Sequence, residues 1–184
     1  MEYKPTGRKE TALGSYVEWD KKANTAYMVL KNKWGVNKLR CSSPHVIPIV
    51  FNSGWFEFQV AEMLSQWEKA QEVIVNATFD YSDKDTKNEI DVIVNMGNKL
   101  LFVECETQIK NLTDLDKFTT AAKKYGGMGV KMLFVTKERM NNKAEEKCQE
   151  NRIIPFSIQS GGLIDPEKAL FALLDNEMSN INTK

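Results

Sequence analysis

Residues 88–108, N-E-I-D-V-I-V-N-M-G-N-K-L-L-F-V-E-C-E-T-Q, decide how the rest of the chain can fold. Two strongly apolar runs flank Gly97-Asn98. Gly followed by Asn between such runs predicts a two-residue hairpin turn, because Gly takes the positive φ that a type II′ turn needs at its first position. The turn would pair Met96 with Lys99 and would fix the register of both strands.

The predicted register gathers four carboxylates. It places Asp91 opposite Glu104 and Glu89 opposite Glu106, all on one face because side chains alternate along a strand. The opposite face would then carry Ile90, Val92, Val103 and Cys105. Like charges directly opposite one another are destabilising, so either water screens this face or a hard divalent cation lies there. The flanking runs are nearly continuously apolar, which is typical of a strand buried on both sides and favours the cation.

Four short motifs between Ser53 and Ile158 resemble a known nuclease family. Asp, about a dozen residues and then Glu-x-Lys on adjacent antiparallel strands is the signature of the PD-(D/E)xK nuclease superfamily, which has the restriction-endonuclease-like fold. The closer resemblance is to the nuclease domain of CRISPR-ancillary effectors, in which a CARF sensor domain precedes the nuclease. The motifs are Gly54-Trp55-Phe56-Glu57, Asn88-Glu89-Ile90-Asp91-Val92, Glu104-Cys105-Glu106-Thr107 and Gly126-Gly127. Together and in this order they are more specific than the superfamily signature alone.

The resemblance implies hydrolysis of nucleic-acid phosphodiester bonds with Mg²⁺ or Mn²⁺. Asp91 and Glu104 would hold the ion, and the backbone carbonyl of Cys105 would be a further ligand. Glu57 would complete the outer shell, although an acid in the first turn of a helix also simply favours the helix dipole. The candidates for phosphate contacts, or for a relocated catalytic Lys, are Lys110, Lys117, Lys123 and Lys124.

One position departs from the family pattern. The family usually has Lys where this chain has Glu106, and that Lys helps to activate the attacking water and stabilises developing negative charge. Glu cannot stabilise an anion, but it can act as a base or as a further metal ligand, and some restriction enzymes of the superfamily use Glu-x-Glu. Alternatively, Glu106 is a substitution that silences a toxic nuclease, since Lys there would pair with Glu89. The sequence leaves both interpretations open.

Composition limits the class of protein. The 184 residues, 42% of them hydrophobic, are enough for a single core with small additions. The 25 basic and 25 acidic residues cancel, which argues against a tight nonspecific nucleic-acid binder but not against a nuclease. Cys41, Cys105 and Cys148 have no CxxC spacing, so we expect free thiols in a reducing cytoplasm. No apolar run reaches the length of a membrane span, and we expect no membrane partner.

Residues 1–52 predict an N-terminal hairpin and connector region. The first eleven residues are polar and are expected to be mobile. Ser15–Trp19 and Thr25–Leu30 read as two strands joined by a polar turn. Residues 31–43 are basic and include Trp34, a combination that can bind single-stranded nucleic acid, although a solvated connector is the simpler interpretation. His45 is the only histidine, so a structural role is favoured over a catalytic one.

Residues 53–184 predict the nuclease-like domain. The expected elements are helices over 53–70, 113–125, 138–150 and 165–178, and strands over 72–79, 131–136 and 153–158, with the hairpin strands between them. A meander followed by βα units predicts an α/β fold with a mixed sheet and helices on both faces. This is the αβββαβ order of the restriction-endonuclease-like core, with an additional αβ.

The expected partners follow from the resemblance. We expect nucleic acid, DNA or RNA, as the substrate and a homodimer as the active form. No CARF-like region fits in the first 52 residues, so any gating by a cyclic nucleotide is expected to lie outside this chain or not to exist. The alternative function is a nuclease fold that binds nucleic acid or a protein without cutting it.

Overall fold

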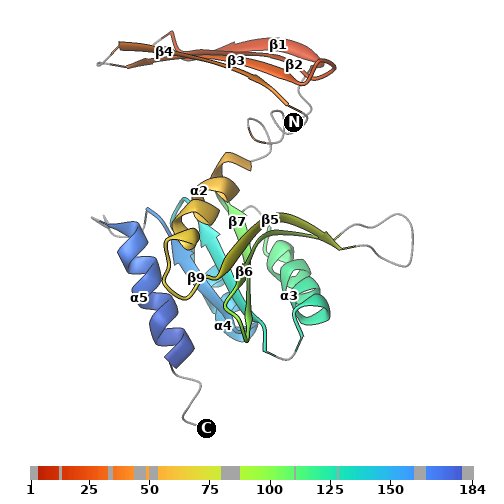
Figure 1. The fold of residues 1–184 in the computed structure, drawn as a ribbon, viewed down its shortest axis with the longest axis vertical. Coiled ribbons are helices and arrows are strands. Elements are labelled where there is room, and N and C mark those ends of the chain that lie inside the picture. Colours follow the sequence, from red (N-terminus) through yellow and green to blue (C-terminus); the bar gives the residue numbers. More distant parts are fainter. Residues whose placement is uncertain are drawn as a thin grey trace. The chain divides into compact units, whose positions relative to one another are not determined.

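The chain divides into two units, Met1–Trp55 and Phe56–Lys184, in the computed structural model (Figure 1). The structure describes residues 4–12, 14–32, 35–43, 49, 54–79, 88–109, 111–127, 129–159 and 165–179. The predictions for Trp34, His45 and Lys110 fall outside these residues. No helix among the described residues is both long and apolar enough to cross a membrane.

The first unit contains a four-stranded antiparallel sheet in the order β1-β2-β3-β4. Its strands are β1 (Thr6–Glu10), β2 (Tyr16–Asp20), β3 (Thr25–Asn32) and β4 (Gly35–Ser42). The prediction of β2 and β3 is confirmed. The expectation of a mobile start and of a basic connector is wrong, because these stretches form β1 and β4.

Trp19 explains why the polar start of the chain is ordered as β1. Its indole N–H donates to the carbonyl of Lys4 at 2.9 Å, and its ring covers Gly7, where a Cβ atom would lie 2.5 Å from the Trp19 Cζ2. The two strands are also joined by the pairing of Gly7 with Trp19. One aromatic side chain therefore fixes a strand that is otherwise mostly exposed.

The second unit is built on a five-stranded sheet in the order β5-β6-β7-β8-β9 (Figure 1). Its strands are β5 (Glu72–Phe79), β6 (Asn88–Asn95), β7 (Leu100–Glu106), β8 (Lys131–Thr136) and β9 (Ile153–Ser157). β5, β6 and β7 pair antiparallel, whereas β7, β8 and β9 pair parallel. The predicted mixed sheet is confirmed, and β5 and β8 have the predicted bounds.

Four helices cover the two faces of this sheet, as predicted. They are α2 (Gly54–Ser65), α3 (Thr113–Tyr125), α4 (Asn142–Glu150) and α5 (Pro166–Ser179). α2 and α5 contribute Phe56, Leu64 and Leu170 to the core cluster on one face. α3 and α4 contribute Phe118 and Cys148 to the cluster on the other face.

Two helix boundaries differ from the prediction. α2 ends at Ser65, and the next residues form single turns, in which Trp67 donates its backbone N–H to Leu64 and Ala70 donates to Trp67. α4 begins at Asn142 because the side chain of Asn141 accepts the Ala144 N–H at 3.0 Å and caps the helix there.

Candidate active site

The β6–β7 hairpin forms with the predicted turn. The backbone N–H of Met96 donates to the Lys99 carbonyl at 2.9 Å, and Gly97 has a φ of 86°. Residues 92–95 pair with residues 100–103 in the predicted register. The Gly-Asn turn therefore fixes which residues of the two strands approach one another.

The two strands stop pairing where the acids begin. The last pair is Val92 with Val103, and beyond it the Oδ2 atom of Asp91 accepts the backbone N–H of Cys105 at 2.8 Å. A side-chain carboxylate thus takes a donor that a backbone carbonyl would take in a regular ladder. The predicted direct opposition of Asp91 to Glu104, and of Glu89 to Glu106, is consequently not a strand pairing.

The alternation of β6 also breaks at Asp91. β5 and β6 pair at Val75–Val92 and at Ala77–Ile90, but not at Asn76–Asp91, and Asn76 has a φ of 56°. Ile90 lies in the core cluster of α3, whereas Val92 lies in the cluster of α2. The prediction that Ile90 shares a face with Val92, Val103 and Cys105 is therefore wrong.

The acids still converge, as their electrostatics show. Burial, followed by the charges of Glu89 and Glu106, raises the pKa of Glu57 to about 7. Glu57 lies in the first turn of α2, so it comes from a different layer of the fold than the hairpin acids. The structure thus brings Glu57, Asp91, Glu104 and Glu106 together, as the motifs predict.

Asp91 and Glu104 are the most strongly perturbed members. Burial raises the pKa of Asp91 to about 7 even though the Cys105 N–H acts in the opposite direction. Burial, and then the charge of Asp91, raises the pKa of Glu104 to about 9. Burial also raises the pKa of the Cys105 thiol well above its ordinary value, so this thiol stays protonated. Carboxylates whose pKa is strongly raised by burial and by neighbouring carboxylates are typical of functional sites.

The carboxylates of this site fit a hard divalent cation only if the ion keeps most of its water ligands. Among the described residues, no group of three or more His, Cys, Asp and Glu side chains is arranged to hold a metal ion. An all-protein cage is therefore not present in this part of the chain. Mg²⁺ commonly binds through one or two carboxylates and keeps several waters, and Asp91 with Glu104 fits that mode.

The predicted phosphate-contacting lysines do not form one group. Lys117 pairs with Asp114 at 3.1 Å, and the Lys124 ammonium lies 5.3 Å from the ring centre of Tyr125. Lys123 instead lines a hollow at the far end of β7.

Sequence analysis missed Lys137, whose backbone lies beside that of Glu106. β8 pairs with β7 in parallel, Thr136 opposite Glu106, and the next N–H, that of Lys137, donates to the Glu106 carbonyl at 3.1 Å. Lys137 reaches this position because β7 and β8, which are far apart in the sequence, pair in parallel. Only a correct guess of the β7–β8 register could have found it.

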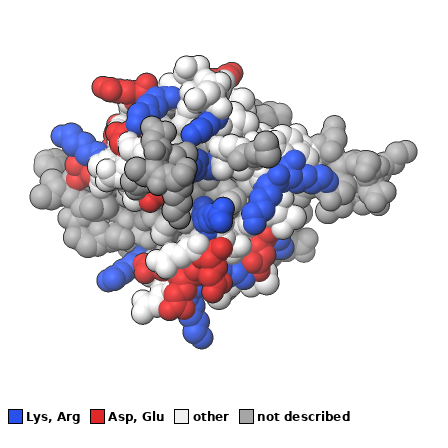
Figure 2. Space-filling model, turned by 90° about the horizontal axis from the view of Figure 1, so that it is seen from below, with Lys and Arg blue, Asp and Glu red and all other residues white. Residues whose placement is uncertain are grey.

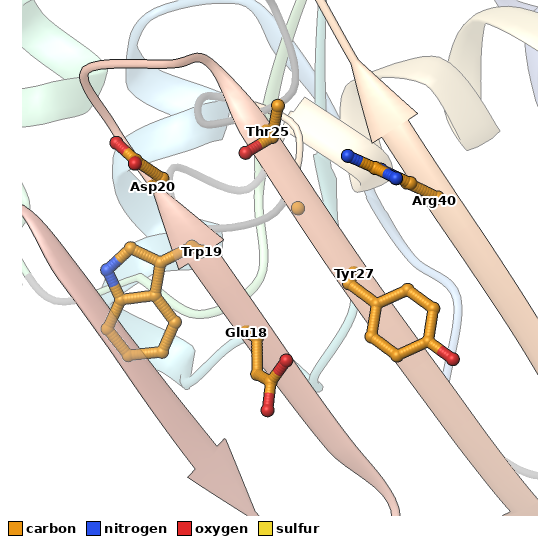
Figure 3. A pocket seen from close by; sticks show the side chains of 7 residues that line it. Glu18, Trp19, Asp20, Thr25, Tyr27 and Arg40 are labelled. Atoms are coloured by element: carbon orange, nitrogen blue, oxygen red, sulfur yellow. The ribbon is translucent and has the colours of Figure 1, made fainter.

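A separate hollow lies in the N-terminal sheet (Figure 3). Its volume is about 450 Å³, and Glu18, Tyr27 and Arg40 lie along neighbouring strands β2, β3 and β4 at its wall. Glu18 accepts a hydrogen bond from Arg8 at 2.9 Å, so part of its charge is compensated. Among the described residues, this hollow has no group of side chains arranged to hold a metal ion. None of its lining residues belongs to the carboxylate site.

Comparison with known proteins places the carboxylate site in a family context. Residues 48–157 match the family model described as Card1-like, endonuclease domain. Can2 from Sulfobacillus thermosulfidooxidans, solved in complex with cyclic tetra-adenylate, is 22% identical with a TM-score of 0.56, covering 80% of this chain and 41% of Can2. Protein VC1899 from Vibrio cholerae is 16% identical with a TM-score of 0.61, covering 80% of this chain and 39% of that protein. No curated protein matches the chain in sequence.

Proposed function

The chain belongs to the Card1-like endonuclease domain family, and we propose that it hydrolyses nucleic-acid phosphodiester bonds with the help of Mg²⁺ or Mn²⁺. The mixed sheet with helices on both faces supports our assignment of the restriction-endonuclease-like fold and of the PD-(D/E)xK superfamily. The observation that carries the proposal is the hairpin end, where Asp91 and Glu104 are partly buried and share one electrostatic environment with Glu57 and Glu106.

The proposed roles follow from the position of each group. Asp91 and Glu104 would hold the cation, with the Cys105 carbonyl as a further oxygen ligand. The bound ion would polarise the phosphate and lower the pKa of a water molecule. The hydrogen bond from the Cys105 N–H orients the Asp91 carboxylate before any ion arrives.

Glu57 would act on the water rather than on the phosphate. A carboxylate with a pKa of about 7, such as that of Glu57, accepts and returns a proton readily at neutral pH. Glu106 adds a further negative charge, which contributes to the raised pKa of both Asp91 and Glu104. A carboxylate at position 106 can only repeat the role of Glu57 as a base, and it offers nothing to a developing phosphate anion.

Glu106 is also the observation that favours a second function. If no cation replaces the missing Lys, the domain would bind nucleic acid without cutting it. Lys137 is our candidate for a relocated Lys, because the β7–β8 register places it directly after the residue opposite Glu106. Cleavage by this chain that is lost in Lys137→Gln would support the relocation.

The biological setting is part of the proposal. The chain spans about two fifths of the length of the two solved structures, at 41% and 39%. Can2 was solved in complex with cyclic tetra-adenylate. We propose that this chain acts in CRISPR-linked defence, with any cyclic-nucleotide gating and dimerisation contributed from outside the residues described here.

The test is cleavage of supercoiled DNA, single-stranded DNA and RNA with Mn²⁺. Asp91→Ala should lower the rate by at least about a hundredfold, equivalent to about 2.7 kcal/mol in the activation barrier. Glu150→Gln, which removes an exposed acid at the end of α4, is the matched control and should leave the rate unchanged. Cleavage that survives Asp91→Ala would refute the assigned site. Binding without cleavage in both this chain and Glu106→Lys would favour the non-cleaving function.

A further inference from the structure

A second charged region lies at the opposite end of the core sheet from the carboxylates. It is a hollow of about 850 Å³ lined by Lys99, Lys123, Lys131 and Arg152, which we call the basic groove. No Asp or Glu is among its described lining residues. A smaller hollow of about 210 Å³ shares Lys99 with it and extends to the β6–β7 turn. In Figure 2 the molecule is seen from below, the side of this turn, and Lys and Arg side chains gather around a hollow on that face.

The topology explains why these cations meet. Lys99 directly precedes β7, Lys131 is the first residue of β8, and Arg152 directly precedes β9. The three strands are parallel neighbours, so their starting residues lie at one edge of the sheet. Each parallel strand therefore brings one cation to this edge, and Lys123 adds another from the last turn of α3.

No acidic residue in the described part of the chain neutralises these four cations. In the described part of the chain none of them forms an ion pair, whereas the lysines at positions 69, 117, 147 and 168 each pair with an Asp. The negative end of a helix dipole would stabilise Lys123, which lies in the last turn of α3. It does not account for Lys99 or Lys131, because they lie at the starts of strands.

The floor of the groove is open to a ligand. Gly127 has a φ of 71° and has no heavy atom within 4 Å of where a Cβ would lie. At Gly129 the nearest atom to such a Cβ is the Lys99 Cγ at 3.8 Å. Backbone without side chains, surrounded by unpaired cations, allows a phosphate to approach closely.

We propose that the basic groove binds the phosphate backbone of a nucleic acid, as a contact surface separate from the cleavage centre. The choice of nucleic acid among polyanions rests on the proposed nuclease function. Glu104 and Glu106 lie five and seven positions after Lys99, about 17–23 Å along the strand, so the groove holds nucleic acid away from the reacting bond. Binding and cleavage should therefore be separable.

The test is binding of fluorescein-labelled single-stranded DNA and RNA to the full chain in EDTA, measured by anisotropy over a range of salt concentrations. The groove variant replaces Lys99, Lys123, Lys131 and Arg152 by Gln. The matched control replaces Arg8, Lys69, Lys147 and Lys168 by Gln, which removes the same charge from cations that are already paired. Thermal unfolding of each variant shows whether it folds.

We expect the groove variant to bind at least about tenfold more weakly, and the slope of log K against log salt to fall by about 3, at about 0.7 per phosphate contact. The control should bind like the unmodified chain. Equal binding by the groove variant, or equal weakening in the control, would overturn the proposal. So would competition by polyglutamate as effective as that by unlabelled oligonucleotide, because the groove would then be a general site for acidic polymers.

Asp91→Ala separates this inference from the proposed function. It should abolish cleavage and leave binding in EDTA intact. If this chain cuts no substrate but the groove variant loses binding, the cleavage proposal fails and the groove proposal stands. If Asp91→Ala itself binds as weakly as the groove variant, the contact surface is at the carboxylates and the groove proposal is wrong.

Discussion

The two ends of β7 carry opposite charges in different electrostatic surroundings. Where the strand begins, Lys99 and Lys131 line an open groove. Where it ends, Glu104 and Glu106 lie among other partly buried acids. Exposed like charges cost little because water screens them, whereas buried carboxylates respond by shifting their pKa. The carboxylates at the end of β7 therefore lower the stability of the fold. A destabilising cluster of this kind is the better candidate for a catalytic site.

The largest expected effect comes from reversing one charge at the acid end. Glu106→Lys would replace a carboxylate whose charge raises the pKa of Glu57, Asp91 and Glu104 by a cation that lowers all three. It would also supply the donor that stabilises negative charge on the phosphate. We expect cleavage with Mn²⁺ to rise by about a hundredfold, as expected from one added electrostatic donor.

The control for this change is Glu89→Lys, which adds the same charge at an exposed position of the same cluster. It should raise the rate far less. Equal gains in both variants would mean that bulk attraction of nucleic acid, and not a catalytic Lys, limits this chain. A loss of activity in Glu106→Lys would show that Glu106 is a working base.

The next effect concerns Glu104→Gln. This variant removes a proposed metal ligand and should lower the cleavage rate, but it should raise the free energy of unfolding. Because the pKa of Glu104 is raised from its ordinary 4.5 to about 9, the folded state binds more protons than the unfolded state between these values. The free energy of unfolding then falls as pH rises through this window. Glu104→Gln should remove this dependence and raise the free energy of unfolding at pH 8 by at least about 2 kcal/mol, with little change near pH 4.

Urea unfolding at the two pH values measures this difference, and Mn²⁺ provides the control. The metal should stabilise the unmodified chain at pH 8, because a ligand that binds only the folded state raises its stability, and should do so less in Glu104→Gln. Equal stabilisation of both proteins by Mn²⁺ would remove Glu104 from the metal site. A variant less stable at pH 8 than the unmodified chain would show that the Glu104 carboxylate is already compensated.

Sequence patterns predicted the parts of the fold in which local preference and burial agree. β5, β8 and α3 have the expected bounds, and the Gly97-Asn98 turn sets the expected register. β1 and β4 were missed because both contain charged residues and are mostly exposed, and only pairing with β2 and β3 orders them. The start of α4 was misplaced because the N–H groups of Lys137 and Glu138 extend the contact with β7, donating to Glu106 and Thr107.

At the carboxylate end of β7, the sequence predicted which acids come together but not how they are arranged. The motifs identify Glu57, Asp91 and Glu104, and the structure brings them together. The carboxylate of Asp91 ends the β6–β7 pairing by taking the Cys105 N–H, and a side-chain acceptor that replaces a backbone one leaves no trace in hydrophobic alternation. The basic end was missed because its cations are far apart in the sequence, although a cation at the start of each parallel strand is a pattern that a known topology would expose.

The smallest expected effect tests whether the two ends depend on one another through the turn that joins β6 and β7. Gly97 has a φ of 86°, and a Cβ there would lie 2.7 Å from the Gln71 Nε2. Gly97→Ala should lower the free energy of unfolding by about 1–2 kcal/mol, the usual cost of a left-handed conformation with a side chain. Gly127→Ala has a similar φ but no neighbour within 4 Å and should cost less, whereas Gly129→Ala should be nearly neutral.

Cleavage per folded molecule should stay unchanged in Gly97→Ala, because four strand pairs between the turn and Asp91 hold the register independently of the turn. Urea unfolding together with single-turnover cleavage separates the two quantities. If the cleavage rate falls by more than the folded fraction, the turn transmits its geometry to the carboxylates. The two ends of β7 would then be structurally coupled, and a ligand in the basic groove could change the cleavage rate at the carboxylates.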